Sequence, residues 1–320
     1  MILRARERNA KINTSKGKQN KKHKHKTEVE KMLNVGVIGC GGMGKDHIKR
    51  LTEKIQGAQV VAVSDVFEEG AKEAAKIAGG AKVYTDGKDL INDPDVDAVF
   101  IVSPGFAHTE SLLQAIEAGK RVFCEKPLAT TADDCKKIVE AEVASGKHLI
   151  QLGFMRRYDK GYVQVKEALK SGEYGEPLIL HCTHRNPEVG TNYNTPMAVH
   201  DTAIHEIDTL HWLVDDEYES AQVIMPKVTK YSHSELKDPQ IMLLRTKRGI
   251  CIDVEVFVNC KFGYDINCEV VCEDGAIKMA QPSYPSIRKD AAVSTKIDTD
   301  CFVRFKDAYD TEVQLSLIHI

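Results

Sequence analysis

The chain has 320 residues, of which 42% are hydrophobic and 28% charged, and its formal net charge is −3. That length permits two domains with a substantial core, and the composition is ordinary for a soluble globular protein. No apolar run is long enough to cross a bilayer as a helix, so we do not expect a helical membrane protein.

The charge is distributed unevenly along the chain. Residues 1–31 carry a net charge of +8, and the remainder carries −11. The tail has few apolar residues, so we expect it to be disordered. It could bind nucleic acid or a membrane surface, but the acidic remainder would repel a phosphate backbone, and we expect neither partner. Because Met32 directly precedes the first predicted strand, the tail is interpreted as a leader translated by mistake.

The last six residues, LSLIHI at 315–320, raise a separate question about the C-terminus. They can be encoded by CTGTCTCTTATACACATC, which resembles a transposon-end adapter used to prepare sequencing libraries. We therefore expect that the natural protein continues differently beyond Gln314. Resequencing the source gene tests this expectation.

The first predicted strand, LNVGVIG at 33–39, leads directly into the sequence GCGGMG. Its glycines match G-x-G-x-x-G, and the following residues 45–55 have the apolar spacing of a helix. In this context the first glycine permits a tight turn, the second a close approach to a pyrophosphate, and the third close helix packing. The predicted cofactor contacts in this loop are Gly39, Gly41, Gly42, Met43 and Gly44.

A second strand, 58–65, ends in Asp65, which follows the last glycine at the spacing expected for an acid that binds the adenine ribose. A carboxylate there accepts hydrogen bonds from both ribose hydroxyls and would repel a 2′-phosphate. The next residues, Val66 and Phe67, supply no arginine. The sequence therefore favours NAD over NADP.

Helices and strands continue to alternate up to residue 153, and this pattern predicts a doubly wound parallel sheet of Rossmann type in an NAD-binding domain over residues 32–152. Ligands of such sheets bind at the carboxyl ends of the strands, where Ser103 and Lys126 are expected. Lys126 lies near the end of the predicted strand 120–127, just after its apolar residues 122–124. A charge in that place needs a partner or a functional role. The further predicted helices are 68–79, 86–94, 108–119 and 133–146, and the further strands are 81–84, 96–104, 120–127 and 147–153.

The pattern changes after Phe154. A helix at 161–172 is followed by strand-like runs that predict an open, largely antiparallel sheet in an α+β domain over residues 153–314, for substrate binding and oligomerisation. Residues 252, 254, 256 and 258 are apolar, whereas the alternate positions are mixed, so one face should be buried. The predicted strands are 177–185, 221–226, 239–246, 249–260 and 264–274.

A predicted helix at 200–214 places Asp201, His205 and Asp208 at i, i+4 and i+7, on one face. Imidazole is suited to taking a proton at neutral pH, so His205 is a candidate general base. Several other histidines, including His200 and His211, could suggest a metal site. No H-E-x-x-H or paired Cys/His cluster is present, and the nine cysteines are scattered, so we expect no metal and reduced thiols in a cytoplasmic protein.

Four features together resemble the glucose-fructose oxidoreductase, inositol dehydrogenase and MocA (Gfo/Idh/MocA) family: GCGGMG, Asp65, the EKP at 125–127 and HDTAIHEID at 200–208. The resemblance extends from about Leu33 to Gln314. The blocks GFMRRYD at 153–159 and HRNPEVG at 184–190 are similar to the inositol-oxidising branch.

This resemblance implies NAD-dependent oxidation of a small polyol, myo-inositol to 2-keto-myo-inositol, by a homotetramer formed through the second sheet. It implies catalysis by Lys126, Asp201 and His205, with Asp201 orienting His205 or joining a proton relay. Further implied cofactor contacts are Ser103, His108, Glu125 and Lys126. The implied substrate contacts are Arg156, His184, Asn186, Asp201, His205 and Tyr264.

Two alternatives remain open. One is the same chemistry on scyllo-inositol, D-chiro-inositol or a pyranose, because epimers differ only in the direction of one hydroxyl. The other is a non-catalytic sugar sensor on this fold. A sensor should have lost Lys126 or His205, and both are present.

Overall fold

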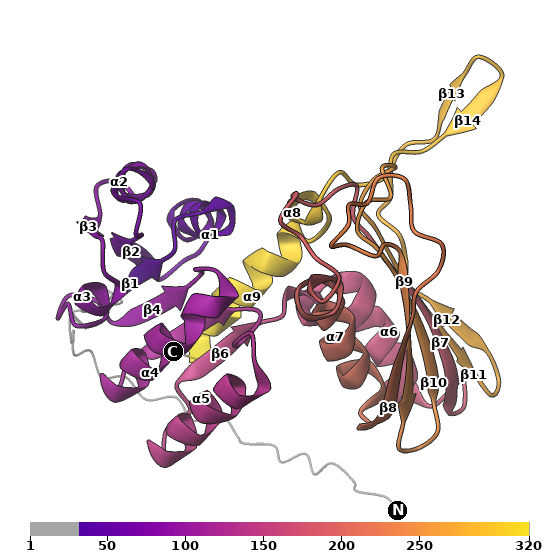
Figure 1. Cartoon of the computed structure of the whole chain (residues 1–320), viewed down its shortest axis with the longest axis horizontal. Helices are drawn as coiled ribbons and strands as arrows, with labels where there is room; N and C mark the ends of the chain where they lie inside the picture. Colours follow the sequence, from indigo (N-terminus) through magenta and orange to yellow (C-terminus); the bar gives the residue numbers. More distant parts are fainter. Residues whose placement is uncertain (1–31, 320) are drawn as a thin grey trace, which may run out of the picture. The chain divides into compact units, whose positions relative to one another are not determined.

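The first half of the described chain forms a six-stranded parallel sheet (Figure 1). The computed structural model describes residues 32–319, so the predictions about residues 1–31 lie outside the described residues. The strand order is β3-β2-β1-β4-β5-β6, which is the order of a Rossmann sheet, so the predicted fold class is confirmed. The strands are β1 (Leu33–Ile38), β2 (Ala58–Ser64), β3 (Lys82–Tyr84), β4 (Ala98–Ile101), β5 (Arg121–Glu125) and β6 (Ile150–Gly153).

Apolar clusters cover both faces of this sheet, which confirms the doubly wound arrangement. On β4, Phe100 packs with one cluster and Val99 with the other, and both are fully buried. One cluster contains residues of α1 and α2, and the other contains residues of α3, α4 and α5. The helices are α1 (Gly42–Glu53), α2 (Glu68–Ile77), α3 (Gly87–Ile91), α4 (His108–Glu117) and α5 (Ala132–Ala144), with a short turn η1 (Gly105–Ala107) before α4.

The second half contains a six-stranded sheet of order β12-β11-β7-β10-β9-β8. Only the β7–β10 pair is parallel among its pairings, so the prediction of a largely antiparallel sheet is confirmed. Its strands are β7 (Pro177–Arg185), β8 (Tyr218–Ile224), β9 (Gln240–Thr246), β10 (Cys251–Phe257), β11 (Asp265–Cys272) and β12 (Ala276–Lys278).

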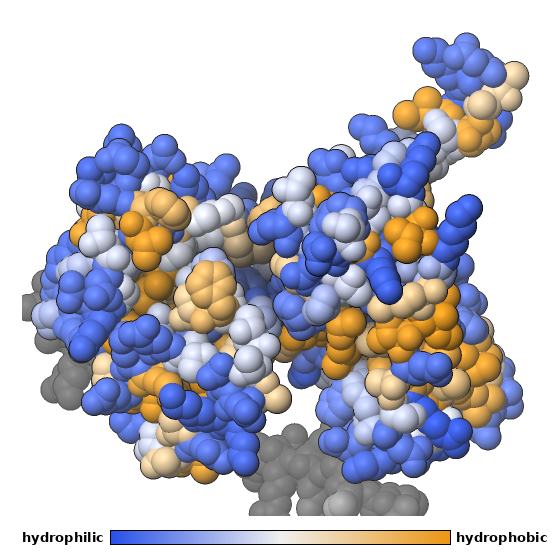
Figure 2. Space-filling view, viewed as in Figure 1, coloured by the Kyte–Doolittle hydropathy of each residue, from blue (hydrophilic) through white to orange (hydrophobic). Residues whose placement is uncertain are grey.

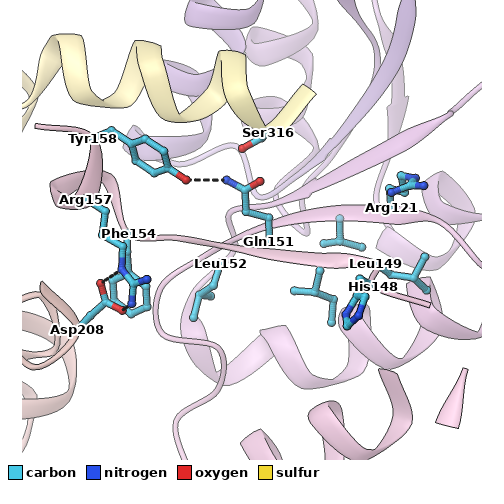
Figure 3. A pocket seen from close by; sticks show the side chains of 12 residues that line it. Arg121, His148, Leu149, Gln151, Leu152, Phe154, Arg157, Tyr158, Asp208 and Ser316 are labelled. Carbon is cyan, nitrogen blue, oxygen red and sulfur yellow. Dashed lines mark hydrogen bonds and ion pairs between the residues drawn. The ribbon is translucent and has the colours of Figure 1, made fainter. Parts of the chain in front are cut away.

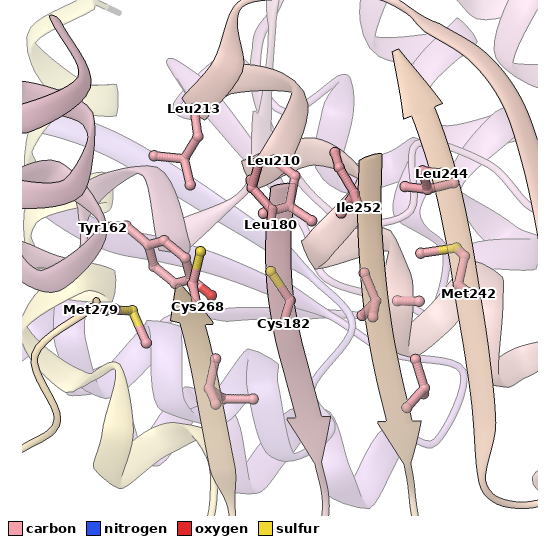
Figure 4. Close-up of a cluster of buried hydrophobic side chains, with 14 of the residues drawn as sticks. Tyr162, Leu180, Cys182, Leu210, Leu213, Met242, Leu244, Ile252, Cys268 and Met279 are labelled. Atoms are coloured by element: carbon pink, nitrogen blue, oxygen red, sulfur yellow. The ribbon is translucent and has the colours of Figure 1, made fainter. Parts of the chain in front are cut away.

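The inner face of this sheet packs against α6 (Lys160–Ser171) and α7 (Ile204–Val214), as Figure 4 shows. Tyr162 of α6 and Leu210 of α7 contact the buried side chains of β7, β10 and β11. The alternation predicted for β10 is confirmed, because Ile252, Val254 and Val256 are at most 2% exposed. Two short helical segments, η2 (Met155–Tyr158) and η3 (Ala198–Ala203), precede α6 and α7.

The chain then forms the hairpin β13 (Ile287–Lys289) and β14 (Ala292–Ser294), a short helix α8 (Cys301–Arg304) and a final helix α9 (Lys306–His319). Helix α9 contributes Tyr309 to the core of the second sheet and Val313 to the core of the first. It therefore joins the two sheets within one compact unit that begins at Met32. The division at residue 152 and the adapter origin of 315–320 stay predictions.

The outer face of the second sheet carries exposed apolar side chains as well as charges. Figure 2 shows hydrophobic surface over these strands. On this face, Ile179 of β7 and Ile224 of β8 are exposed, and Ile241 and Leu243 of β9 are partly exposed. Within residues 32–319, no helix combines the length and apolar character needed to cross a membrane.

Candidate active site

The glycine-rich loop connects β1 to α1, and each glycine has a separate steric role. Gly39 has φ +96°, and a Cβ there would lie 2.5 Å from the backbone nitrogen of Ser103. A Cβ on Gly44 would lie 1.9 Å from the carbonyl oxygen of Gly39. A Cβ on Gly41 would meet no atom within 4 Å. The first and third glycines are therefore required by the protein itself, whereas the second leaves open space at the start of α1.

This difference predicts opposite behaviour for two alanine variants. Gly44→Ala should lower the melting temperature strongly, because its Cβ overlaps the loop backbone. Gly41→Ala should leave the melting temperature nearly unchanged but weaken NAD binding by roughly tenfold or more, since its Cβ occupies the space that a pyrophosphate approaches. Differential scanning fluorimetry and calorimetric titration with NAD measure the two effects. Equal NAD affinity in Gly41→Ala would contradict the assignment.

Asp65 lies at the end of β2, beside the glycine-rich loop. Its Oδ2 accepts a hydrogen bond from the Cys40 N–H at 2.7 Å, and its Oδ1 accepts one from the Phe67 N–H at 2.9 Å. These contacts hold the carboxylate at the loop, and each oxygen keeps further acceptor capacity. The neighbours Val66 and Phe67 are largely exposed and uncharged, so they supply no cation for a 2′-phosphate.

Three other predicted cofactor residues lie near the ends of β4 and β5. Ser103 follows β4, Glu125 is the last residue of β5, and His108 begins α4. The Ser103 hydroxyl is buried without a hydrogen-bond partner in the described chain, and such an orphaned group fits a ligand contact. The His108 ring nitrogens lie 2.7 Å from the carbonyl oxygens of Ser103 and Pro127. Glu125 Oε1 lies 2.8 Å from His47 Nε2 in the interior. The side chains of His108 and Glu125 are thus engaged by protein groups, and both brace the turn that presents Lys126.

Lys126 and Asp201 come together although they are far apart in the sequence. The Lys126 Nζ donates to the Asp201 carboxylate at 3.0 Å and to its backbone carbonyl at 2.9 Å. Asp201 lies in η3, a π-helical segment that the sequence analysis did not predict. Such segments are rare and often occur at functional sites. Lys126 at the end of β5 and Asp201 in η3 therefore form an ion pair that is partly exposed to solvent.

His205 lies at the beginning of α7 and is buried. Its Nδ1 is enclosed and has no partner in the described chain, so in this structure it does not donate a hydrogen bond to the Asp201 carboxylate. Asp201 binds Lys126 instead, and Asp208 binds Arg157. The two carboxylates that were predicted to share a helix face with His205 therefore do not bind it, because each forms an ion pair with a basic residue of another segment. Burial, together with the charges of Lys126 and Arg156, holds the pKa of His205 well below its usual value, so the imidazole is neutral at neutral pH.

Arg156 is fully buried, and in this structure it does not line an open cavity. Its guanidinium forms an ion pair with Glu206 and lies 3.1 Å from His184 Nδ1. The Glu206 Oε2 lies 2.8 Å from the same nitrogen. Direct contact between Arg156 and a substrate stays a prediction, because in this structure the guanidinium contacts His184 and Glu206.

Glu206 was not predicted as a functional residue, although its position in the sequence indicated a buried charge. Glu206, Leu210 and Leu213 have the spacing of one helix face, and the two leucines are buried. A charged residue on a buried stripe needs a partner. Arg156 and His184 supply that partner, and they outweigh the effect of burial, so the pKa of Glu206 lies below its usual value.

His184, Tyr264 and Asn186 occupy neighbouring positions at the ends of β7 and β11. The Tyr264 ring meets the His184 ring edge-on, with centroids 5.9 Å apart, and the His184 and His205 rings are 6.2 Å apart. Asn186 is half-buried, and its N–H donates to the Phe257 carbonyl. The structure therefore brings Lys126, Asp201, His205, His184 and Tyr264 into one region.

A cavity of about 670 Å³ lies beside this region, along β6 (Figure 3). It is lined by residues of β5, β6, η2 and α7, and by Ser316 of α9. Phe154 links it to the site, since its ring contacts the His205 ring edge-on at 6.3 Å. Lys126, Asp201 and His205 do not line it, so we assign the chemistry to the Lys126 region and not to this cavity. No group of three or more metal-binding side chains occurs within residues 32–319.

Comparisons with known proteins agree with this arrangement. Inositol 2-dehydrogenase of Pseudomonas syringae pv. syringae is 54% identical over 283 residues, which cover 88% of this chain and 84% of that protein. Inositol 2-dehydrogenase/D-chiro-inositol 3-dehydrogenase of Halalkalibacterium halodurans is 52% identical over 88% of this chain and 81% of that protein. The crystal structure of myo-inositol dehydrogenase from Lactobacillus casei in complex with NAD(H) and myo-inositol superimposes with a TM-score of 0.86 and 45% identity, over 89% of this chain and 85% of that one.

Two family profiles match consecutive parts of the chain. The profile described as oxidoreductase family, NAD-binding Rossmann fold, matches residues 33–154. The profile of the GFO/IDH/MocA C-terminal domain matches residues 162–278. The chain therefore belongs to the Gfo/Idh/MocA oxidoreductase family and has its NAD-binding Rossmann fold.

Proposed function

We propose that this protein is an NAD-dependent inositol 2-dehydrogenase, which oxidises myo-inositol to 2-keto-myo-inositol in inositol catabolism. The observation that carries the proposal is the grouping of a lysine ammonium, a neutral buried histidine and a second buried histidine at the carboxyl ends of the Rossmann strands. The named relatives, at 52% to 54% identity, support the same substrate class.

His205 acts as the general base. Its neutral imidazole can take the proton of a ring hydroxyl, and the ring nitrogen with access to the site is Nε2, because Nδ1 is enclosed. Lys126 donates a hydrogen bond to the same oxygen and stabilises the alkoxide that develops there. Asp201 holds the Lys126 ammonium in place and accepts a hydrogen bond from it.

The cofactor is held by the glycine-rich loop, by Asp65 on the adenine ribose, and by the Ser103 region. NAD, when bound, accepts the hydride from the carbinol carbon. The chain contributes alignment and charge, because His205 can accept the proton and the Lys126 ammonium can stabilise the oxygen. The buried Ser103 hydroxyl, which has no hydrogen-bond partner in the described chain, is available to bind the cofactor.

The isomer of inositol is a finer question. The Halalkalibacterium relative is named for both myo-inositol and D-chiro-inositol, so dual specificity is a specific second candidate. A non-catalytic sugar sensor has no supporting observation of this kind, because Lys126 and His205 are both in place.

We further propose a cytoplasmic homotetramer that associates through the outer face of the second sheet. Ile224 of β8 and its neighbours Ile241 and Leu243 of β9 support this assignment, since partly exposed apolar side chains on a sheet face are typical of an interface. Sedimentation velocity of the purified chain tests it.

The experiment that tests the function is an assay of NADH formation by its near-ultraviolet absorbance. We expect turnover of myo-inositol with NAD and little with NADP. Parallel reactions with scyllo-inositol, D-chiro-inositol and glucose rank the alternatives. NADH formation from glucose but from no inositol would overturn the substrate assignment, and binding of polyols without turnover would favour the sensor.

A further inference from the structure

Three buried side chains lie next to the proposed catalytic residues and have no assigned role in the proton and hydride transfer. Glu206 of α7, Arg156 of η2 and His184 of β7 are each at most 3% exposed. Their side chains are joined by an Arg156–Glu206 ion pair and by the contact of Glu206 with His184. Because unpaired polar and charged groups are costly in the interior, the hydrogen-bond partners of His184 determine which ring nitrogen carries its proton.

The position of Arg156 shows which group pairs with His184 Nδ1. The Arg156 Nη2 lies 3.1 Å from Nδ1 and 3.5 Å from Nε2. A donor in the ring plane along the Nδ1 lone pair would lie much farther from Nε2, which is on the other side of Cε1. Arg156 therefore lies over the face of the ring, an arrangement that guanidinium groups adopt readily on flat side chains.

Glu206 is left as the hydrogen-bond partner of Nδ1. Its Oε2 is 2.8 Å away, and an ionised carboxylate can only accept. The proton of His184 is therefore on Nδ1. Burial and the charges of Arg156 and Lys126 hold the pKa of His184 below its usual value despite Glu206, so the ring is neutral and Nε2 keeps its lone pair.

We propose that Glu206 is a positioning residue that fixes His184 as the Nδ1–H tautomer, so that Nε2 accepts a hydrogen bond from a second hydroxyl of the polyol. This role rests on the proposed function for the identity of the substrate, but the tautomer itself does not. A site built to accept from a hydroxyl discriminates strongly against an analogue that lacks it, because its own polar atom is left unpaired. Glu206 thus sets specificity without touching the substrate.

Glu206→Gln is the sharpest test, because it is nearly isosteric. The glutamine oxygen accepts from Arg156, and its NH₂ group then donates to Nδ1. The His184 proton moves to Nε2, which changes from an acceptor into a donor. We expect kcat/KM for myo-inositol to fall by roughly 10- to 100-fold, the factor that corresponds to one buried unpaired polar contact.

Two measurements separate this role from a structural one. The ring ¹⁵N shifts of His184 in histidine-labelled protein report the tautomer without any substrate. We expect Nδ1–H in the wild type and in Glu206→Asp, which keeps the charge, and Nε2–H in Glu206→Gln. The second measurement compares myo-inositol with its monodeoxy analogues. Removal of the hydroxyl that donates to His184 Nε2 should lower kcat/KM strongly in the wild type but only slightly in Glu206→Gln. Removal of any other hydroxyl should lower kcat/KM equally in both proteins.

Glu255→Gln is the matched control, since Glu255 of β10 forms a partly exposed ion pair with Arg185 of β7. It should change neither the His184 tautomer nor the deoxygenation pattern. An Nε2–H tautomer in the wild type, or in Glu206→Asp, would overturn the proposal even if Glu206→Gln does not fold. If no inositol is oxidised while the tautomer shifts as expected, the proposed function fails and the proton assignment stands. An unchanged deoxygenation pattern in an active Glu206→Gln would overturn the specificity role.

Discussion

Replacing Lys126 by methionine should lower kcat for myo-inositol oxidation by about 10³-fold while NAD still binds. The ammonium is placed where negative charge develops on the substrate oxygen, and removal of one such donor typically costs two to three orders of magnitude. Methionine keeps the length and most of the volume of the side chain, so the turn after β5 should persist. Steady-state kinetics and calorimetric titration with NAD measure the two properties separately.

The matched control for this variant is Lys136→Met on α5, a lysine that is largely exposed and contacts Glu140 at 3.8 Å. Its kinetics should equal those of the wild type. Because Lys126 also holds Asp201, a double variant Lys126→Met/Asp201→Asn should be little worse than Lys126→Met alone, since the two side chains act as a unit. Near wild-type turnover in Lys126→Met would refute the assigned role.

Replacing His205 by glutamine should lower kcat/KM by roughly 10²- to 10⁴-fold, the range for loss of a general base. The wild type should also keep its activity well below pH 6.5, because the pKa of His205 is held far below that value and the neutral form persists. The acid limb of the pH–rate profile should be absent from the variant. Chemical rescue of His205→Ala by added imidazole would support the base role directly.

His211→Gln is the control, because His211 lies on the same helix and is 43% exposed beside Glu217. Its pH profile and rate should match those of the wild type. If His205→Gln retained the acid limb with undiminished kcat/KM, another group would be the base.

The same histidine affects stability. A pKa that is lower in the folded protein than in the unfolded chain means that the unfolded chain binds more protons at acid pH. The free energy of unfolding should therefore fall as the pH drops below about 6.5, the usual value for histidine. His205→Gln should reduce this dependence, and urea titrations of both proteins between neutral and mildly acid pH can measure the difference.

Local sequence patterns determined most of the fold. Hydrophobic runs of β-branched residues predicted the strands, and helical spacing predicted the helices between them, because these periods depend only on which face is buried. The glycine positions could also be predicted from the sequence, since Gly39 and Gly44 are required by backbone geometry alone. The NAD preference of Asp65 follows from charge and from its place at a strand end. Lys126, His205 and Asp201 were named from motifs that resemble a family.

The tertiary structure decided how those residues interact. Asp201 and His205 are close in the sequence, and the helical spacing predicted that they share a face; the family resemblance implied that Asp201 orients His205 or joins a proton relay. Instead, Asp201 binds Lys126, which approaches from β5, and His205 keeps an unpartnered Nδ1. Glu206 acquired its role in the same way, from Arg156 on η2 and His184 on β7. The protonation of these residues depends on burial and on hydrogen-bond partners that come from distant segments of the chain. A sequence pattern identifies the residues that need a partner, but only the tertiary structure determines which partner each residue has.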